Sequence, residues 1–221
     1  MILATIAAVR PGESNSASLG IAILIALHRM LSQEQSESER SDHDLWVFGY
    51  GSLMWRPGFD FIEQVPARLI GEHRALCVYS FDHRGTPEKP GLVLGLDRGG
   101  ACRGIAFRVR DEQRHATLEY LRGREQTTNV YREVMRSVWL ENAARDRVSA
   151  LAYVVDRGHV QYAGRLTLAE QLHYVRQGHG RSGANRDYVL ATVKAIEAQG
   201  CRDQQLHQLA TMLHEGATAH P

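Results

Sequence analysis

The order of secondary-structure signals along the chain constrains its fold more than any other feature. Strand-like runs come first, between about residue 45 and residue 155, and helical patterns dominate the part that follows. Strands and helices that come in separate blocks are typical of an α+β domain, here with a largely antiparallel or mixed sheet. We therefore expect a single α+β domain of this kind.

The strand signals are compact apolar runs or runs with alternating apolar positions. Leu45–Tyr50 (LWVFGY) is apolar and aromatic, and Arg103–Arg110 (RGIAFRVR) places every second side chain on one apolar face. Further β-rich runs are Ala67–Phe81, Val134–Leu140 and Ala150–Val155, with Gly91–Leu96 as a weaker one. The pattern predicts five or six strands.

Helical spacing predicts helices from Asp111 to about Arg122, from Thr167 to about Gln177, from Asp187 to Gln199 and from Asp203 onward. Asp111 is expected to cap the first of these helices. Thr167 and Glu170 have the spacing of a capping box at the start of the second. Gly200 is expected to end the third.

Residues 1–44 are expected to form a leader outside the domain, which would span residues 45–214 and be followed by a tail, 215–221. The longest apolar stretch of the leader, Leu19–Leu27, is well short of the roughly 20 residues that cross a bilayer, so we expect no stable membrane insertion. Only Arg10 precedes it, which disfavours a signal peptide. We interpret this stretch as a helix that docks on the domain or on a partner, followed by a polar linker; an over-extended start codon would also explain such a leader.

Composition excludes several function classes. Lys and Arg total 26 against 25 for Asp and Glu, a formal charge of +1, so a nucleic-acid partner is not expected. The three cysteines, Cys77, Cys102 and Cys201, lie far apart and cannot all pair within one molecule, which favours reduced thiols and a cytoplasmic location. The histidines are scattered and no metal-binding motif is present, so no metal is expected.

Two short patterns resemble well-known motifs without the context that those motifs need. Gly178, Gly180 and Gly183 match GxGxxG, but they follow a predicted helix, whereas a dinucleotide site follows a strand. A loop between two helices is the better interpretation. Ser52 lies in GYGSLMW, which is not the GxSxG elbow of a serine hydrolase.

The segment Phe48–Trp55 (FGYGSLMW) is the first candidate for a binding site. A strand that runs directly into Gly-Ser forms a tight turn whose unpaired backbone amides can converge on an anion. The same residues would equally suit an ordinary turn at the end of a strand, with Tyr50 and Trp55 in the core.

Two further segments carry candidate side chains. Glu125 falls at the junction between a predicted helix and a strand, where a scaffold can present a carboxylate to a cavity. It could instead be a surface carboxylate paired with Arg122 or Arg124. The loop within Ser80–Leu96 contains Arg84, which could hold a carboxylate, although the loop could also be a simple hairpin connection.

Together these segments resemble the ChaC family of glutathione-specific γ-glutamylcyclotransferases. The matching stretches are WVFGYGSLMWRPGF, HRGTPEKPGLVLGL, GGACRGIAF, YLRGRE with Tyr131 after it, and GRSGANRDYVLATV. They occur in the family's order and cover about Leu45 to Met212. The chain departs from many members at Asn129 and Val130, where those members have a glycine before the tyrosine.

The resemblance implies a small mixed β-barrel flanked by helices, no metal or other cofactor, and glutathione as the substrate. The α-amine of the γ-glutamyl group would attack its own γ-carbonyl, which releases 5-oxoproline and Cys-Gly. By the same resemblance Glu125 is the general base and acid. The residues implied for substrate binding are Phe48, Gly49, Tyr50, Gly51, Ser52 and Leu53, with Arg84 and Tyr131 as second contacts.

Two alternatives to this function stay open, and the oligomeric state is not fixed by the sequence. A cyclotransferase for other γ-glutamyl amines or peptides would use the same glutamate and turn, with a different pocket for the leaving group. A non-catalytic regulator of cation transport, suggested by the family's name, would form no lactam product.

Overall fold

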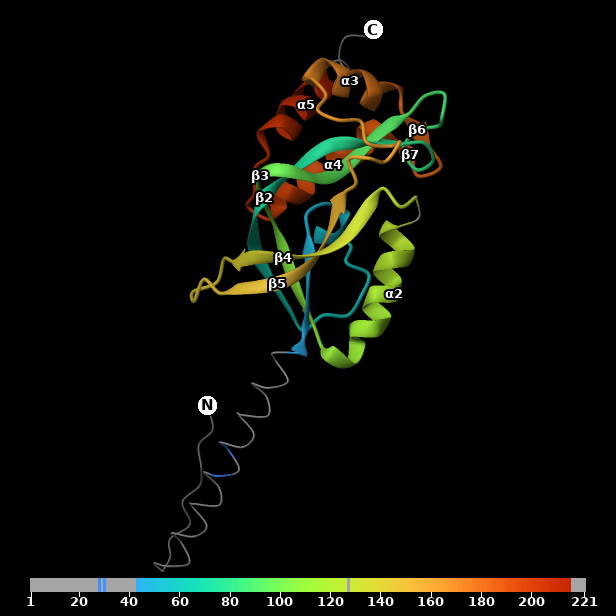
Figure 1. Ribbon diagram of the computed structural model, residues 1–221. Coiled ribbons are helices and arrows are strands. Elements are labelled where there is room, and N and C mark those ends of the chain that lie inside the picture. Colours follow the sequence, from blue (N-terminus) through green and yellow to red (C-terminus); the bar gives the residue numbers. More distant parts are fainter. Residues whose placement is uncertain (1–27, 29, 31–42, 127, 216–221) are drawn as a thin grey trace, which may run out of the picture. The chain divides into compact units, whose positions relative to one another are not determined.

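The computed structural model describes residues 28, 30, 43–126 and 128–215. The leader and tail predicted from the sequence therefore lie almost entirely outside the described residues. The described residues from Asp44 onward form one compact unit (Figure 1). Within it Asp44 accepts a hydrogen bond from Arg108 Nε at 2.8 Å and one from the Asp111 amide at 3.1 Å.

A closed five-stranded barrel forms the centre of this unit, in the order β1-β3-β2-β4-β5. Its strands are β1 (Leu45–Gly49), β2 (Glu63–Ser80), β3 (Gly91–Val109), β4 (Tyr131–Leu140) and β5 (Arg147–Val155). β1 runs parallel to β5, and every other neighbouring pair is antiparallel. The predicted α+β class and mixed barrel are confirmed.

The β2–β3 hairpin is longer than the sequence patterns predict. The runs Gly91–Leu96 and Arg103–Arg110, expected as two strands, belong to the single strand β3. Gly99 and Gly100 lie between them at φ 99° and 72°, a region that favours glycine, and the register of β2 against β3 shifts opposite them. Pairing therefore continues through a bend that looks like a break in the sequence.

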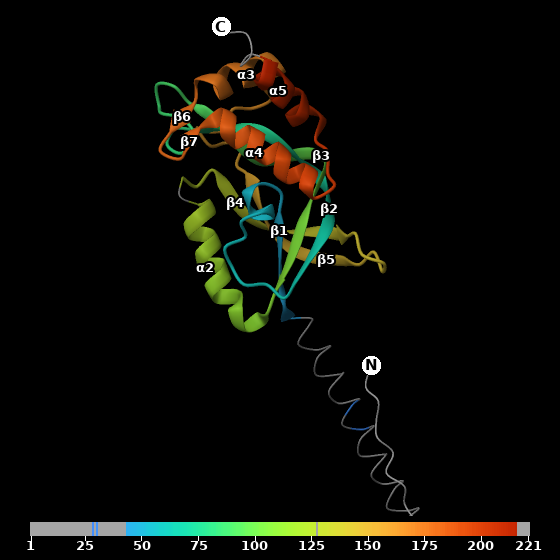
Figure 2. The same cartoon turned by 180° about the vertical axis from the view of Figure 1, so that it is seen from behind.

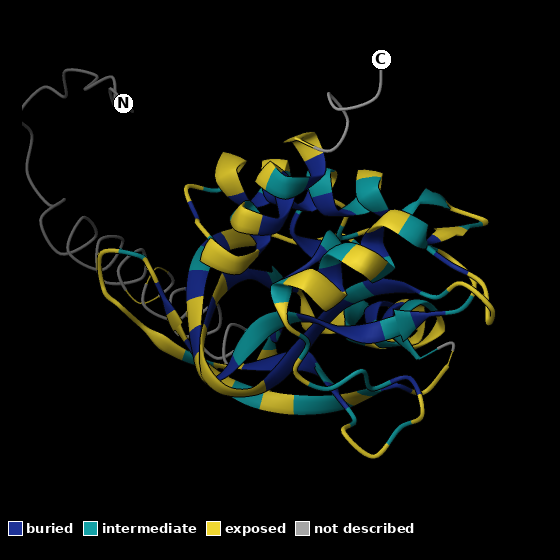
Figure 3. Ribbon diagram, turned by 90° about the horizontal axis from the view of Figure 1, so that it is seen from above, coloured by how far each residue is buried: buried dark blue, intermediate teal, exposed yellow. Residues whose placement is uncertain are grey.

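Four α-helices flank the barrel: α2 (Arg114–Glu125), α3 (Leu168–Gln177), α4 (Asn185–Ala198) and α5 (Gln204–Glu215). α2 lies along the side of the barrel, where Leu121 packs among core residues of β1, β3 and β5. The other three gather over the extended ends of β2 and β3, as seen from both sides in Figures 1 and 2. Their buried residues face the hairpin, and exposed residues cover their outer turns (Figure 3). No described helix is long and apolar enough to span a membrane.

The helix ends test the predicted caps. The capping box of Thr167 and Glu170 is confirmed, since the Thr167 side chain accepts from the Glu170 amide and the Glu170 carboxylate accepts from the Thr167 amide. The predicted cap at Asp111 is wrong. A short 3-10 turn, η2 (Asp111–Gln113), comes first, and the Asp111 carboxylate instead accepts from Arg114 Nε at 2.9 Å. The helix expected from Asp203 onward is confirmed as α5, and Asp203 caps it by accepting from the Leu206 amide at 3.1 Å.

The GxGxxG pattern lies between α3 and α4, as predicted, and not after a strand of the barrel. It folds into a short hairpin of β6 (His179–Gly180) and β7 (Gly183–Ala184). The amides of Arg181 and Ser182 donate to the carbonyls of Asp82 and His83 at 2.9 and 3.0 Å. The hairpin thus packs its backbone on the loop between β2 and β3.

Candidate active site

The chain leaves β1 at Gly49 and forms a 3-10 turn, η1 (Ser52–Met54). The Met54 amide is the first in this turn to bond back, to the Gly51 carbonyl at 2.9 Å. The amides of Ser52 and Leu53 come before that bond, and no described residue accepts a hydrogen bond from them. The turn therefore offers two adjacent free amides, an arrangement that suits an anion.

The turn borders a cavity of about 750 Å³ between the barrel, the end of α2 and the start of α4. Seven of the nine residues predicted for the site line this cavity: Tyr50, Gly51, Ser52, Leu53, Arg84, Glu125 and Tyr131. Phe48 and Gly49 do not line it. Phe48 is fully buried in the barrel core, and a Cβ on Gly49 would lie 3.1 Å from the Leu53 Cβ, so these two residues pack beneath the turn.

Glu125 is the last residue of α2, and the end of the helix places its side chain at the cavity. The side chain is only 18% exposed. Burial raises the pKa of Glu125 above its ordinary value, while the neighbouring Arg124 opposes that rise. A carboxylate with a raised pKa can both accept and return a proton more readily near neutral pH.

Arg124 joins the end of α2 to the turn after β1. Its Nη2 donates to the Ser52 hydroxyl at 2.8 Å, and its Nη1 donates to the Arg56 carbonyl at 2.6 Å. Its Nε lies 3.1 Å from Glu125 Oε1. Glu125 thus has the arginine partner that the sequence allowed, but the pair lies in the cavity. Arg122 bonds to Glu133 instead.

The loop after β2 brings Arg84 to the cavity. Arg84 Nη1 donates to the Ser182 carbonyl at 2.5 Å, and its guanidinium carbon lies 5.3 Å from the centre of the Tyr188 ring. The loop is therefore more than a hairpin connection, since it presents a cation held by the β6–β7 hairpin and by an aromatic ring.

Near the cavity, side chains of α4 and β4 bond to the backbone groups at the edge of β3, where a neighbouring strand would otherwise pair. Asn185 is fully buried, and its amide group bonds to both backbone groups of Leu92, at 2.6 and 2.7 Å. The Tyr188 hydroxyl accepts from the Leu94 amide at 3.2 Å, and the Tyr131 hydroxyl donates to the Leu94 carbonyl at 2.7 Å. Asn185 and Tyr188, three residues apart on α4, therefore bond to Leu92 and Leu94, two residues apart on β3.

Three tyrosines that line the cavity keep their protons. Burial is the main cause that raises the pKa values of Tyr50, Tyr131 and Tyr188 above their ordinary value. They therefore contribute neutral hydroxyl groups and apolar ring surface near Glu125 at physiological pH.

Sequence reasoning did not assign roles to three residues that line the cavity, Arg124, Ser182 and Tyr188, or to Asn185, which is buried behind it. Arg124 was considered only as an ion-pair partner, and the other three lie in the stretch GRSGANRDY, whose resemblance signal could have found them. At Asn129 the backbone φ is 57°, a left-handed conformation that asparagine tolerates better than most residues. Among the described residues, no group of His, Cys, Asp and Glu side chains could hold a metal ion.

The fold and the cavity define the class of protein. The structure of the glutathione-specific γ-glutamyl cyclotransferase from yeast matches with a TM-score of 0.70 at 22% identity, over 78% of this chain and 96% of that one. At that identity the likeness shows the shared fold, and it confirms the predicted γ-glutamylcyclotransferase-like architecture. Residues 45–216 match the family described as ChaC-like protein. The chain belongs to this family.

Curated relatives agree with this assignment. The glutathione-specific gamma-glutamylcyclotransferase of Escherichia coli K12 is 31% identical, over 75% of this chain and 71% of its own length. The human glutathione-specific gamma-glutamylcyclotransferase 1 is 32% identical, over 77% and 79% respectively. Gamma-glutamylcyclotransferase 2-3 of Arabidopsis thaliana is 31% identical, over 76% and 88%. The family resemblance found in the sequence is confirmed.

Proposed function

We propose that this chain is a γ-glutamylcyclotransferase that cleaves glutathione to 5-oxoproline and Cys-Gly. The observation that carries the proposal is the buried carboxylate of Glu125, with its raised pKa, in one cavity with the free amides of the η1 turn. Membership of the ChaC-like family and the names of the relatives support glutathione as the substrate.

The reaction needs a group that moves one proton twice. An α-amine has a pKa of about 8, so much of it is protonated and unreactive at neutral pH. The unprotonated amine attacks the γ-carbonyl and closes the five-membered ring, and Glu125 accepts the proton that the attacking nitrogen loses in this step. It then returns a proton to the cysteinyl nitrogen as the original amide C–N bond breaks. General acid and base action of this kind contributes about 10²- to 10⁴-fold in rate.

The cavity supplies the rest by orientation. The amides of the η1 turn suit the substrate's α-carboxylate or the oxyanion that develops on the γ-carbonyl; one donor to such an oxyanion is commonly worth about 3 kcal/mol. Among the lining residues, Arg84 provides a cation and Tyr131 a neutral side chain. A substrate folded into the ring-closing conformer gains an effective molarity of roughly 10⁵ M or more.

Turnover of glutathione tests the proposal directly. The purified full chain is incubated with reduced glutathione, γ-Glu-Ala or γ-glutamyl-lysine, and 5-oxoproline is measured by chromatography. We expect glutathione to be the preferred substrate. Preference for another compound would reassign the leaving-group pocket, and no lactam from any of them would exclude a cyclotransferase and favour a non-catalytic regulator.

The variant Glu125→Gln tests whether Glu125 transfers the proton. Glu125→Gln is expected to stay folded and to lose at least about 10²-fold of the rate, because the amide cannot accept the proton. Glu119→Gln, in the same helix but with a side chain 68% exposed, is the matched control and should keep full activity. Near-wild-type turnover by Glu125→Gln would remove Glu125 from the mechanism.

We also place the enzyme in the cytoplasm. The three cysteines are all buried and free, which is typical of a protein from a reducing compartment.

A further inference from the structure

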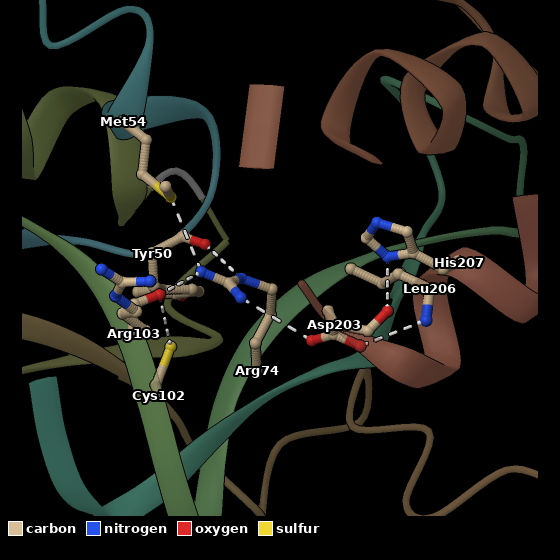
Figure 4. A network of polar contacts seen from close by, with 8 residues as sticks. All are labelled: Tyr50, Met54, Arg74, Cys102, Arg103, Asp203, Leu206 and His207. Carbon is tan, nitrogen blue, oxygen red and sulfur yellow. Dashed lines mark hydrogen bonds and ion pairs between the residues drawn. The ribbon is translucent and has the colours of Figure 1, made fainter. Parts of the chain in front are cut away.

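Arg74 on β2 is a buried arginine that does not line the cavity but contacts the turn that does (Figure 4). Its side chain is 5% exposed. Nε donates to the Tyr50 carbonyl at 2.5 Å, and Nη2 donates to the Arg103 carbonyl at 2.8 Å and contacts Met54 Sδ at 3.6 Å. Nη1 lies 3.7 Å from Asp203 Oδ2. The guanidinium group thus joins the segment after β1, the strand β3 and the residue before α5.

The bond to the Tyr50 carbonyl also fixes an amide. That carbonyl and the Gly51 amide belong to one peptide unit, which is planar and trans, so the C=O and N–H bonds point in opposite directions. With the oxygen held by Arg74, the Gly51 amide points away from Arg74. Gly51 itself lines the cavity. The orientation of the Gly51 amide, which directly precedes the free amides of Ser52 and Leu53, therefore depends on a residue behind it.

Tyr50 and Met54 anchor the turn through side chains packed in the core, and Arg74 adds a bond to its backbone. β1 ends at Gly49, so Tyr50 and Gly51 have no place in the strand ladder. Arg124 holds Ser52 from the side of α2, at 2.8 Å. Arg74 holds the same turn from the barrel, and the two arginines fix it at positions two residues apart.

The pairing of Arg74 also links the turn to α5. A buried guanidinium needs partners for its donors, because burial of an unpaired charge is costly. Two of its partners are backbone carbonyls, and the carboxylate of Asp203 supplies the charge. The same carboxylate caps α5 by accepting from the Leu206 amide at 3.1 Å.

We propose that Arg74 is a positioning residue for the cyclotransferase reaction: it orients the Tyr50–Gly51 peptide so that the amides of the η1 turn meet the γ-glutamyl group. This inference rests on the proposed function. A lysine offers one compact ammonium group and cannot reach all the partners of a planar guanidinium, so Arg74 and lysine are not equivalent here.

Steady-state kinetics on two variants test the proposal. Arg74→Met is expected to lower kcat/KM for glutathione at least tenfold per folded molecule, and Arg74→Lys to recover part of that loss. A loss that falls on KM assigns the turn to the substrate's α-carboxylate, and a loss that falls on kcat assigns it to the oxyanion. Either supports the proposal. Folded fractions come from circular dichroism and thermal melting.

Arg157→Met provides the matched control, because Arg157 also pairs with a buried carboxylate, Asp97 at 2.7 Å, and with a backbone carbonyl, but does not line the cavity. It should lower the melting temperature and leave KM and kcat unchanged. If Arg74→Lys behaved in the same way, with a lower melting temperature and unchanged kinetics, the positioning role would be overturned. Arg74→Lys alone therefore decides the test if Arg74→Met fails to fold.

Wild-type turnover separates this inference from the proposed function. A wild-type protein that forms no 5-oxoproline contradicts the function itself. An active wild type whose Arg74 variants keep their kinetic constants contradicts only the positioning role.

Discussion

The Nε atom of Arg124 lies 3.1 Å from Oε1 of its neighbour Glu125, so the pKa of Glu125 depends on two opposing effects, burial and this positive charge. Burial raises the pKa of Glu125, and the positive charge of Arg124 lowers it. The burial effect is the larger, so the carboxyl group titrates above its ordinary range while the ion pair limits the rise. The arginine therefore tunes the proposed general base as well as holding Ser52.

Arg124→Met should shift the pH dependence of catalysis. Without the arginine only the effect of burial remains, so the pKa of Glu125 rises further and the base stays protonated to a higher pH. We expect the acid limb of the kcat/KM profile to move to higher pH, and the rate at the optimum to fall by up to about 10²-fold because the bond to Ser52 is lost. The measurement is kcat/KM for glutathione across a pH series.

Arg122→Met is the control for that experiment. Arg122 lies on the same helix and pairs with Glu133 at 2.8 Å, outside the cavity. Its removal should leave the acid limb where it is in the wild type. An acid limb that stays in place in Arg124→Met would show that Arg124 does not tune Glu125.

Glu125→Gln should be more stable than the wild type at neutral pH. Because the folded-state pKa of Glu125 is raised, its ionisation at neutral pH favours the unfolded chain. Glutamine removes that cost. The gain in melting temperature should shrink as the pH falls through the folded-state pKa and vanish below the unfolded value of about 4.3.

Glu133→Gln should show the opposite sign in the same melting series. The hydrogen bond from Arg122 lowers the pKa of Glu133, so its carboxylate stabilises the folded protein above the unfolded value. The variant should lose stability at neutral pH and approach the wild type as the pH falls through the lowered folded-state pKa. If the melting temperatures of Glu125→Gln and Glu133→Gln changed with pH in the same way, the raised pKa of Glu125 would be contradicted.

Local patterns predicted most of the fold. Alternation in Arg103–Arg110 and the capping box at Thr167 depend on residues close in sequence, and both are confirmed. The continuity of β3 could not be predicted, because it depends on how Gly99 and Gly100 bend against the irregularity around Gly71 on β2. That pairing is set by the partner strand.

The site divides in the same way. The turn at Ser52 follows from a strand that ends in glycine and serine, and Glu125 follows from its place at the end of a helix. Whether Glu125 is buried depends on packing against segments far away in the sequence. The residues behind the site, Arg74 and Asn185, act through backbone groups that lie far away in the sequence. No pattern near Arg74 indicates its role, whereas Asn185 lies in a stretch that carries the family resemblance.

Asn185→Leu should destabilise the protein strongly. The side chain is fully buried and bonds to the amide and the carbonyl of Leu92 at the edge of β3. Leucine would leave both groups buried without partners, at about 1–3 kcal/mol each. Urea denaturation measures the loss. Asn142→Leu, at an exposed turn, should cost less than about 1 kcal/mol, and equal losses for the two variants would contradict the role of Asn185.

Gly180→Ala should reduce activity through the loop that carries Arg84. A Cβ at position 180 would lie 2.1 Å from the Asp82 carbonyl oxygen and 2.7 Å from the Arg84 amide, both backbone atoms that cannot rotate away. The loop has to shift, and Arg84 moves with it. We expect kcat/KM for glutathione to fall by up to about 10²-fold.

Gly158→Ala separates this close approach from the general effect of replacing a glycine. A Cβ there would meet only Asp156 Oδ1 at 3.5 Å, an ordinary contact, so the variant should keep wild-type kinetics. If Gly180→Ala also kept them, the β6–β7 hairpin would not hold the loop of Arg84. If it loses activity as expected, Gly180 of the GxGxxG pattern is required because two protein backbones meet there, and the pattern needs no phosphate ligand to explain it.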